Sequence, residues 1–393
     1  MTSLIKNATT NPPFKWTGGK NRMRHQYRDV FFPDGEIKTF VDMFCGACSI
    51  SLWVAENYPN ANIVLNDNNG ELMELYKVFQ DDYDGLEKRY NENVKKFLSF
   101  EGTDKVTYSD IASYLNENIT EADTQDLIDT TASMAKFVSK ETKARKKNKA
   151  SFDSDENRLA LFKDTKKKLA ANKQRIKNHT LPWKFIDSFP KPGDLKKTLD
   201  RKNFYYSLRD RYAHHWQSQT RTENAGDLLF MMRVNFNGIW KGYEVCNGRY
   251  STPPGTLLQK EKFFEPTQVR KFKEFLDRCE IRTGDFENLT DWQEEGTYYY
   301  ADPPYRDSVV VYDGGFGESD QKRLVSFLKQ CSDTGCWISE SNKEIGDSFW
   351  ENHFGEEYTI HDMDAKYTAG RGTTTIDVKE VLVTNFKNNV DTE

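Results

Sequence analysis

The hydrophobic and polar positions at the two ends of the chain alternate as they do in strands and helices. The N-terminal part predicts strands and helices in turn, at residues 39–44, 49–56, 61–65 and 71–79. The C-terminal part predicts four more strands and a helix, at residues 279–283, 297–301, 321–330, 336–339 and 378–385. Strands that alternate with helices predict an α/β fold, with a mostly parallel sheet covered on both faces.

The middle of the chain has a different pattern. Residues 80 to about 230 are polar, rich in lysine and helical in periodicity, with a proline-containing break at 181–194. We therefore expect one α/β domain that is interrupted by a long, mainly helical insertion. The expected segments are residues 1–90, 91–203, 204–262 and 263–393.

Composition indicates the compartment. The hydrophobic content of 37% is enough for a core, and no apolar run is long enough to span a bilayer. The first residues lack the apolar stretch of a signal peptide. Six cysteines in 393 residues are typical of free thiols in a reducing compartment. We expect a cytoplasmic protein that does not bind membranes.

The charge is distributed unevenly. The net charge of −5 does not by itself indicate a nucleic acid partner, but residues 140–177 are strongly basic. Their lysines either form solvated helix faces or contact phosphates. The lysines that we predict to contact phosphates are Lys146, Lys147, Lys167 and Lys168.

The strand at 297–301 ends in Asp302-Pro303-Pro304-Tyr305. An amine attached to an aromatic ring is a poor nucleophile, because its lone pair is delocalised. Two fixed acceptors, the Asp302 carboxylate and the Pro303 carbonyl, can draw such a nitrogen towards tetrahedral geometry, and the prolines keep them rigid. Tyr305 offers a ring face for a flat substrate. The alternative interpretation is a proline-rich turn that closes a strand.

A second candidate site follows the first predicted strand. Phe44, Cys45 and Gly46 form a turn where an α/β fold lets a ligand approach the backbone. Asp67 ends the next strand, where a carboxylate can accept both ribose hydroxyls of a nucleoside cofactor. A helix-capping aspartate is the alternative. The full G-x-G-x-x-G fingerprint is absent, which disfavours nicotinamide cofactors.

Two further pairs complete the predicted cofactor site. Trp16 could cover a cofactor and Lys20 could reach its carboxylate. Asp285 and Phe286 follow another strand, so that Asp285 could accept from an adenine amine while Phe286 packs on the ring; a capped turn is equally compatible. We expect no metal, because neither cysteine pair has the further Cys or His ligands that structural zinc needs.

With these residues in hand, the chain resembles the Dam-like (D12 class) DNA adenine-N6 methyltransferases. The similar segments follow the family's order and are Phe14–Lys20, Asp42–Gly46, Asn66-Asp67, Tyr205–Tyr212, Arg233–Lys241, Ser251–Gly255, Asp302–Tyr305, Ile338–Asn342 and Gly370–Gly372. The resemblance implies a Rossmann-like methyltransferase sheet with an inserted, mainly helical target-recognition region. It also implies S-adenosylmethionine (AdoMet) as cofactor, S-adenosylhomocysteine as product and double-stranded DNA as partner.

The resemblance also implies DNA contacts within residues 204–262. Its candidates are Arg233, Phe236, Asn237, Lys241 and Pro253. Phe236 would enter the base stack, Asn237 would help hold the space left by a flipped base, and Lys241 would approach a base edge. Lys241 stands where the family often has an arginine, and residues 91–200 exceed the usual family length. The target sequence therefore stays open.

Other functions and assemblies remain open at this point. The planar amine could instead belong to cytosine N4, an RNA base or a protein amide, although an aspartate in the motif favours adenine. A DNA-binding relative without catalysis is a further alternative, which the presence of Asp302, Phe44 and Asp67 disfavours. A monomer and a weak dimer are both compatible with the sequence.

Overall fold

A computed structural model describes most of the two ends of the chain and part of its middle. The described residues are 10–14, 16–100, 192–214, 216–235, 238, 240, 250, 252, 254–255, 266–306, 316–368 and 375–386. The chain forms two compact units, one of residues 1–87, 237–252 and 265–393, the other of residues 88–236 and 253–264. In the described part, no helix is long and apolar enough to cross a membrane.

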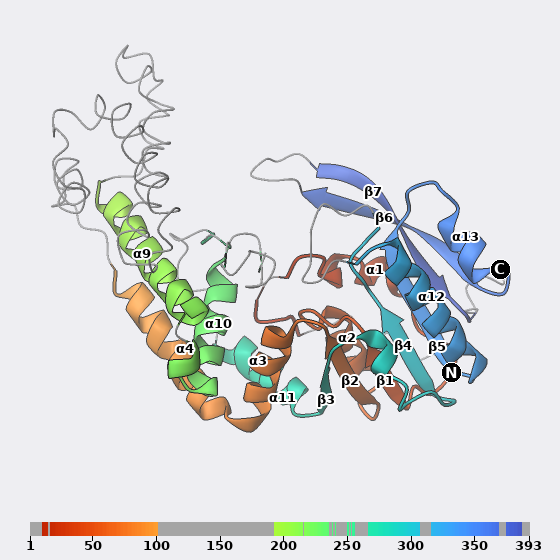
Figure 1. The fold of residues 1–393 in the computed structure, drawn as a ribbon, viewed down its shortest axis with the longest axis horizontal. Coiled ribbons are helices and arrows are strands. Elements are labelled where there is room, and N and C mark those ends of the chain that lie inside the picture. Colours follow the sequence, from red (N-terminus) through yellow and green to blue (C-terminus); the bar gives the residue numbers. More distant parts are fainter. Residues whose placement is uncertain are drawn as a thin grey trace, which may run out of the picture. The chain divides into compact units, whose positions relative to one another are not determined.

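The first unit is built on a seven-stranded sheet (Figure 1). Its strands are β1 (Thr39–Asp42), β2 (Asn62–Asp67), β3 (Cys279–Thr283), β4 (Thr297–Ala301), β5 (Trp337–Lys343), β6 (Thr359–Thr368) and β7 (Thr375–Thr384), in the order β3-β2-β1-β4-β5-β7-β6. The first five strands are parallel, and β7 runs antiparallel to both β5 and β6. The predicted mostly parallel α/β sheet is thus confirmed.

The sheet has a topological switch point between β1 and β4. From β1 the chain passes to β2 and β3 on one side, and then crosses to β4 on the other side of β1. In the register of this pair, Asp42 lies opposite Tyr300. The residues that follow β1 and those that follow β4 therefore leave the sheet side by side. Ligands of open α/β sheets bind at such a place, outside the carboxyl ends of the strands.

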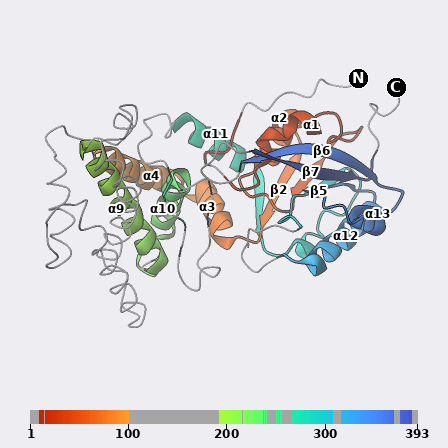
Figure 2. The ribbon, with the colours of Figure 1, turned by 90° about the horizontal axis from the view of Figure 1, so that it is seen from above.

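Helices cover both faces of this sheet, and Figure 2 places α2 and α12 on opposite sides. On one side the rings of Phe31, Trp53 and Tyr298 pack together, with Trp53 supplied by α2 (Ser49–Asn57) and Phe31 by the segment after α1 (Arg24–Tyr27). The other side is covered by α12 (Glu318–Asp333) and α13 (Phe349–Phe354). Because both faces are buried, the central strands read as continuous runs of apolar and aromatic residues.

Within the described residues, the first unit also contains α3 (Gly70–Asp81), α11 (Pro266–Leu276) and the short 3₁₀-helices η1 (Lys20–Arg22) and η5 (Phe286–Asn288). The side-chain amide of Gln80 on α3 donates to the carbonyls of Leu276 and Cys279, at 2.6 and 2.8 Å. These bonds fix α3, whose first turn follows β2, beside the edge strand β3.

The described part of the second unit is helical, as the periodicity predicts. It contains α9 (Pro192–His214), η2 (Trp216–Ser218), α10 (Arg221–Val234) and the C-terminal part of α4 (Tyr83–Leu98). Asp227 is fully buried on α10 and accepts from Arg89 at 2.8 Å, Asn93 at 2.7 Å and Arg211 at 2.6 Å. A buried carboxylate needs such partners, so this cluster ties the three helices together.

Several elements of the fold differ from the sequence-based expectation. The sequence does not predict strand β6 or helices α11 and α13, and the polar residues of β6 conceal its strand character. The predicted break at 181–194 extends too far, because α9 already begins at Pro192. Proline is well suited to the first helical position. Strand β5 continues to Lys343, four residues beyond the predicted strand, because its polar end is buried and hydrogen-bonded.

Candidate active site

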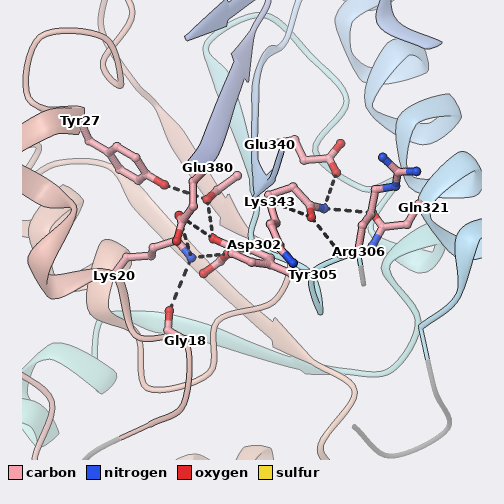
Figure 3. A network of polar contacts seen from close by, with 12 residues as sticks. Gly18, Lys20, Tyr27, Asp302, Tyr305, Arg306, Gln321, Glu340, Lys343 and Glu380 are labelled. Atoms are coloured by element: carbon pink, nitrogen blue, oxygen red, sulfur yellow. Dashed lines mark hydrogen bonds and ion pairs between the residues drawn. The ribbon is translucent and has the colours of Figure 1, made fainter. Parts of the chain in front are cut away.

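Asp302 follows the last residue of β4, at the carboxyl end of the sheet. Its Oδ1 lies 2.7 Å from Nζ of Lys20 on η1, a lysine whose side chain is almost completely buried (Figure 3). Burial raises the pKa of Asp302 to about 6, against the opposing effect of Lys20. Asp302 is therefore largely ionised at neutral pH, and it keeps one oxygen that Lys20 does not bind.

Tyr305 lies on the same lysine. Nζ of Lys20 is 4.5 Å from the centroid of the Tyr305 ring, a cation–π distance. The Tyr305 hydroxyl donates to Oε2 of Glu380 at 2.9 Å and lies 3.1 Å from Oγ of Ser341, which in turn is 2.7 Å from the hydroxyl of Tyr27. Both ends of the Tyr305 side chain are thus held.

A second set of polar side chains holds the backbone of the same loop. Gln321 on α12 donates to the carbonyl of Pro304 at 2.8 Å, and Asn342 donates to Gln321 at 3.0 Å. Asn342 also accepts from the backbone N–H of Arg306 at 3.1 Å. Burial raises the pKa of the neighbouring Glu340 to about 8, so that this carboxyl is mostly neutral at pH 7. The Asp302–Tyr305 loop is therefore fixed from two sides (Figure 3).

The predicted cofactor turn lies after β1. The Asp67 carboxylate accepts from the N–H groups of Gly46 at 3.0 Å and Asn69 at 2.9 Å, and burial raises its pKa. The hydroxyl of Tyr76 donates to the carbonyl of Gly46 at 2.6 Å, and the N–H of Cys45 donates to the carbonyl of Asn66 at 2.8 Å. The strand-end acid and the turn are thus one hydrogen-bonded unit.

Trp16 covers this turn. Gly46 has φ +45°, and a Cβ atom at this position would lie 2.7 Å from Nε1 of Trp16. The sequence predicts that Trp16 covers a cofactor, and the structure brings its indole against the backbone of the predicted cofactor turn. Lys20, by contrast, points to Asp302, whereas the sequence-based hypothesis assigns it to a cofactor carboxylate.

The other predicted cofactor residues lie next to the turn. The rings of Phe44, Phe286 and Phe316 form a cluster with centroids 5.6–6.2 Å apart. Asp285 caps the 3₁₀-helix η5 by accepting from the N–H of Glu287 at 2.9 Å, and it also pairs with Arg323 at 3.0 Å. Asp285 therefore caps a helix, which is one of the two interpretations that the sequence allows. Its contact with a cofactor stays a prediction.

The cysteines of the turn pack as small buried residues. Cys45 and Cys48 are free and buried, and burial raises the pKa of Cys45 well above its usual range. Cys48 adopts a left-handed conformation, with φ 60°, where α2 begins. The described residues contain no group of three or more His, Cys, Asp or Glu side chains arranged to hold a metal.

Of the predicted DNA-contacting residues, the structure describes Arg233, which is buried on α10 within the second unit. The rest lie outside the described residues, namely Phe236, Asn237, Lys241, Pro253, Lys146, Lys147, Lys167 and Lys168. Their roles stay predictions.

Glu71 is a contact residue that the sequence does not reveal. It lies in the first turn of α3, and its carboxylate accepts from Nε1 of Trp240 at 2.9 Å and from the hydroxyl of Tyr250. The rings of Trp240 and Tyr250 are 5.2 Å apart. Glu71, four residues after Asp67 in the chain, thus binds two residues of the predicted recognition segment. A glutamate early in a helix looks like an ordinary helix-dipole partner, so it gave no signal.

Glu380 is the other such residue. The sequence predicts the terminal strand but assigns no role to its single glutamate. The structure buries Glu380 beside Tyr305 and Lys20. A charged residue directly before the apolar run Val381-Leu382-Val383 was the available signal.

Comparison with known proteins adds independent findings. The family described as D12 class N6 adenine-specific DNA methyltransferase matches residues 16–154 and 135–369. The Type II methyltransferase M.MjaIII of Methanocaldococcus jannaschii is 21% identical over 360 residues, which cover 88% of each chain. The Type II methyltransferase M1.LlaDCHI of Lactococcus lactis subsp. cremoris is 28% identical over 203 residues, 48% of this chain and 67% of that one. The Retron Ec67 DNA adenine methylase of Escherichia coli is 26% identical over 179 residues, 45% of this chain and 59% of that one.

Proposed function

The chain belongs to the D12 class of N6 adenine-specific DNA methyltransferases, and from this premise we propose that it methylates an adenine flipped out of double-stranded DNA, with AdoMet as the donor. The observation that carries the proposal is the Asp302 carboxylate, held at 2.7 Å by the buried Lys20 where β4 ends, next to the end of β1. Because its relatives include Type II methyltransferases, a role in a restriction-modification system is part of the proposal. A DNA substrate makes the cytoplasm the proposed place of action.

The turn after β1 fits AdoMet. Gly46 lets the indole of Trp16 lie directly against the turn, Asp67 keeps lone pairs that the N–H groups of Gly46 and Asn69 do not use, and the phenylalanine cluster offers apolar ring faces. The proposed cofactor-binding residues are Trp16, Phe44, Cys45, Gly46, Asp67, Asp285 and Phe286. Lys20 and Asp302 are proposed to act on the amine. When bound, AdoMet supplies an electrophilic methyl group and leaves as S-adenosylhomocysteine.

The proposed work of the protein lies in preparing the amine. Asp302 accepts one N–H of the adenine N6 amine and the Pro303 carbonyl accepts the other, so that the lone pair is available for attack. Lys20 holds the other Asp302 oxygen, which keeps the carboxylate ionised and oriented. Tyr305 offers its ring as the stacking face for the extruded base. The N6 proton that becomes acidic after methyl transfer passes to Asp302 or to solvent.

A product assay tests the proposed function. The purified protein is incubated with AdoMet carrying a labelled methyl group and with unmethylated duplex DNA, and the DNA is digested to nucleosides. Label in N6-methyladenine is expected, and modified-base sequencing of the same DNA identifies the target site. Label in N4-methylcytosine, in RNA or only in protein would contradict the proposal. A single-stranded DNA of the same sequence, which should be methylated more slowly, tests the preference for a duplex.

The cofactor assignment predicts a loss of affinity in the Asp67→Asn variant. The substituted amide keeps one acceptor and gains a donor, so it cannot accept both ribose hydroxyls while it accepts the N–H groups of Gly46 and Asn69. We expect AdoMet affinity to fall by about tenfold or more, as for the loss of a hydrogen bond to a charged group. Calorimetric titration measures it. Asp84→Asn, at an exposed position on α4, is the matched control and should bind AdoMet normally.

The pKa of Asp302 predicts an acid limb in the pH profile. The acceptor role needs the ionised carboxylate, and its pKa of about 6 means that this form is lost below pH 6. At saturating AdoMet, kcat/KM for DNA should fall about tenfold per pH unit below that value and level off above it. Because Lys20 lowers this pKa, Lys20→Met should move the limb to higher pH. Lys38→Met, at an exposed position, should leave it in place. A limb that does not move with Lys20→Met would mean that another group titrates.

A further inference from the structure

Glu380 is a buried carboxylate in a strand that does not need one for its fold. Strand β7 is hydrogen-bonded through its backbone to β5 on one side and β6 on the other. Val381, Leu382 and Val383 supply its apolar packing, and all three are buried. Burying a carboxylate costs several kcal/mol before its partners compensate, and apolar replacements of buried ion pairs are often as stable. A role beyond packing is therefore the better explanation.

The partners of Glu380 are the catalytic groups. Its Oε2 accepts from the Tyr305 hydroxyl at 2.9 Å and lies 4.0 Å from Nζ of Lys20. The same Nζ is 2.7 Å from Asp302 and sits over the Tyr305 ring. One lysine is thus placed between two carboxylates, and Tyr305 touches both the lysine and Glu380. Figure 3 shows these side chains converging from η1, β7 and the loop after β4.

This arrangement leaves Asp302 more exposed than Glu380. The side chain of Asp302 keeps 17% of its accessible surface, whereas those of Lys20 and Glu380 keep 5% and 3%. Asp302 is therefore the member of the cluster that a substrate can reach, and Glu380 lies behind the reacting groups. Its position suits it to orient Tyr305 and Lys20 and does not suit it to touch the base.

We propose that Glu380 is a positioning residue for methyl transfer, which acts by holding the hydroxyl of Tyr305 and the ammonium of Lys20. Through these two contacts it keeps the stacking ring of Tyr305 and the acceptor oxygen of Asp302 in a fixed mutual geometry. The inference rests on the proposed function of Asp302 and Tyr305. It adds a residue from the terminal strand, which is 75 positions away from Tyr305 in the chain.

The test is the single-turnover rate at saturating AdoMet and DNA for Glu380→Gln, Glu380→Ala, Tyr305→Phe and the two Glu380 variants combined with Tyr305→Phe. We expect Glu380→Gln to lower the rate about tenfold, the scale on which a hydrogen bond to a charged group exceeds a neutral one, since it can still accept from Tyr305 but loses the charge beside Lys20. Glu380→Ala should lower it by about 10²-fold, the scale of a misplacement of about 1 Å at a reacting centre. Neither variant touches the Gly46 turn. The AdoMet dissociation constant should therefore change less than about twofold in both variants, well below the change that one lost hydrogen bond causes.

The double variants distinguish positioning through Tyr305 from an independent effect. If Glu380 acts partly through the tyrosine hydroxyl, Glu380→Ala should cost clearly less in the Tyr305→Phe background than in the wild type. Effects that multiply in full, or wild-type rates in both Glu380 variants, would overturn the inference. Glu351→Gln, at an exposed position on α13, controls for the chemical change and should keep the wild-type rate.

Folding and function are separated by two further measurements. Thermal unfolding shows whether each variant is folded. Glu380→Gln is nearly isosteric with the wild type. If Glu380→Ala does not fold, Glu380→Gln and its combination with Tyr305→Phe therefore still test the inference. A Glu380 series at the wild-type rate overturns only this inference, provided that Asp302→Ala is inactive. An active Asp302→Ala variant would instead refute the proposed function.

Discussion

Asp302→Ala is expected to abolish methylation of DNA and to leave AdoMet binding nearly unchanged. Asp302 is the ionised acceptor that lies at the carboxyl end of β4, and no other described carboxylate pairs with Lys20 at hydrogen-bond distance. Loss of one fixed acceptor for a developing charge typically costs about 10²–10³ in rate, and a charged acceptor costs more. Single-turnover methylation with labelled AdoMet measures the rate, and calorimetric titration measures the binding.

The control for this variant is a second aspartate on the same unit. Asp291→Ala changes an exposed carboxylate whose side chain pairs with Arg282, so its rate should stay at the wild-type level. Asp302→Ala also frees the ammonium of Lys20, which should then pair more closely with Glu380. A wild-type rate in Asp302→Ala would show that the amine is prepared by another group. A loss of AdoMet binding equal to the loss of rate would show that Asp302 serves the cofactor instead.

The parts of this site that could be predicted from the sequence are those fixed by short-range pattern. Asp67 and Asp302 each lie within two residues of the end of an apolar run, and carboxyl ends of parallel strands meet at one edge of a sheet. Gly46 stands in a small-residue turn directly after the first strand. For these residues the order of strands was enough to bring them to the same edge, and the structure places them there.

The parts that could not be predicted depend on contacts between distant segments. Lys20 and Asp302 are 282 residues apart, and no periodicity indicates which of two anions, a cofactor carboxylate or Asp302, the lysine meets. Gln321 reads as a polar residue early in an amphipathic helix, yet it is buried against the Pro304 carbonyl. The polar residues at the end of β5 are also buried, so the pattern predicts too short a strand. Burial of polar side chains at a functional site conceals them from patterns that assume polar means exposed.

Gly46→Ala is expected to weaken AdoMet binding strongly while the protein stays folded. Gly46 has φ +45°, a left-handed conformation that costs a residue with a Cβ about 1–2 kcal/mol. The added methyl would also lie 2.7 Å from Nε1 and 2.8 Å from Cδ1 of Trp16, so the indole must move away from the turn that it covers. The backbone cost alone corresponds to about 5–30-fold in affinity if it falls on the bound form, and displacement of Trp16 adds to it. Calorimetric titration with AdoMet measures the change.

A second glycine on the same unit gives the matched control. Gly70 is the first residue of α3, and a Cβ there meets nothing within 4 Å. Gly70→Ala should therefore bind AdoMet normally, and it should be equally or slightly more stable to heat, because alanine reduces the freedom of the unfolded chain. Trp16→Ala separates the two causes in Gly46→Ala. If displacement of the indole dominates, Gly46→Ala should add little to Trp16→Ala; if the strained turn dominates, the two losses should multiply. Wild-type AdoMet affinity in Gly46→Ala would contradict both, and would mean that the cofactor does not approach the backbone at this turn.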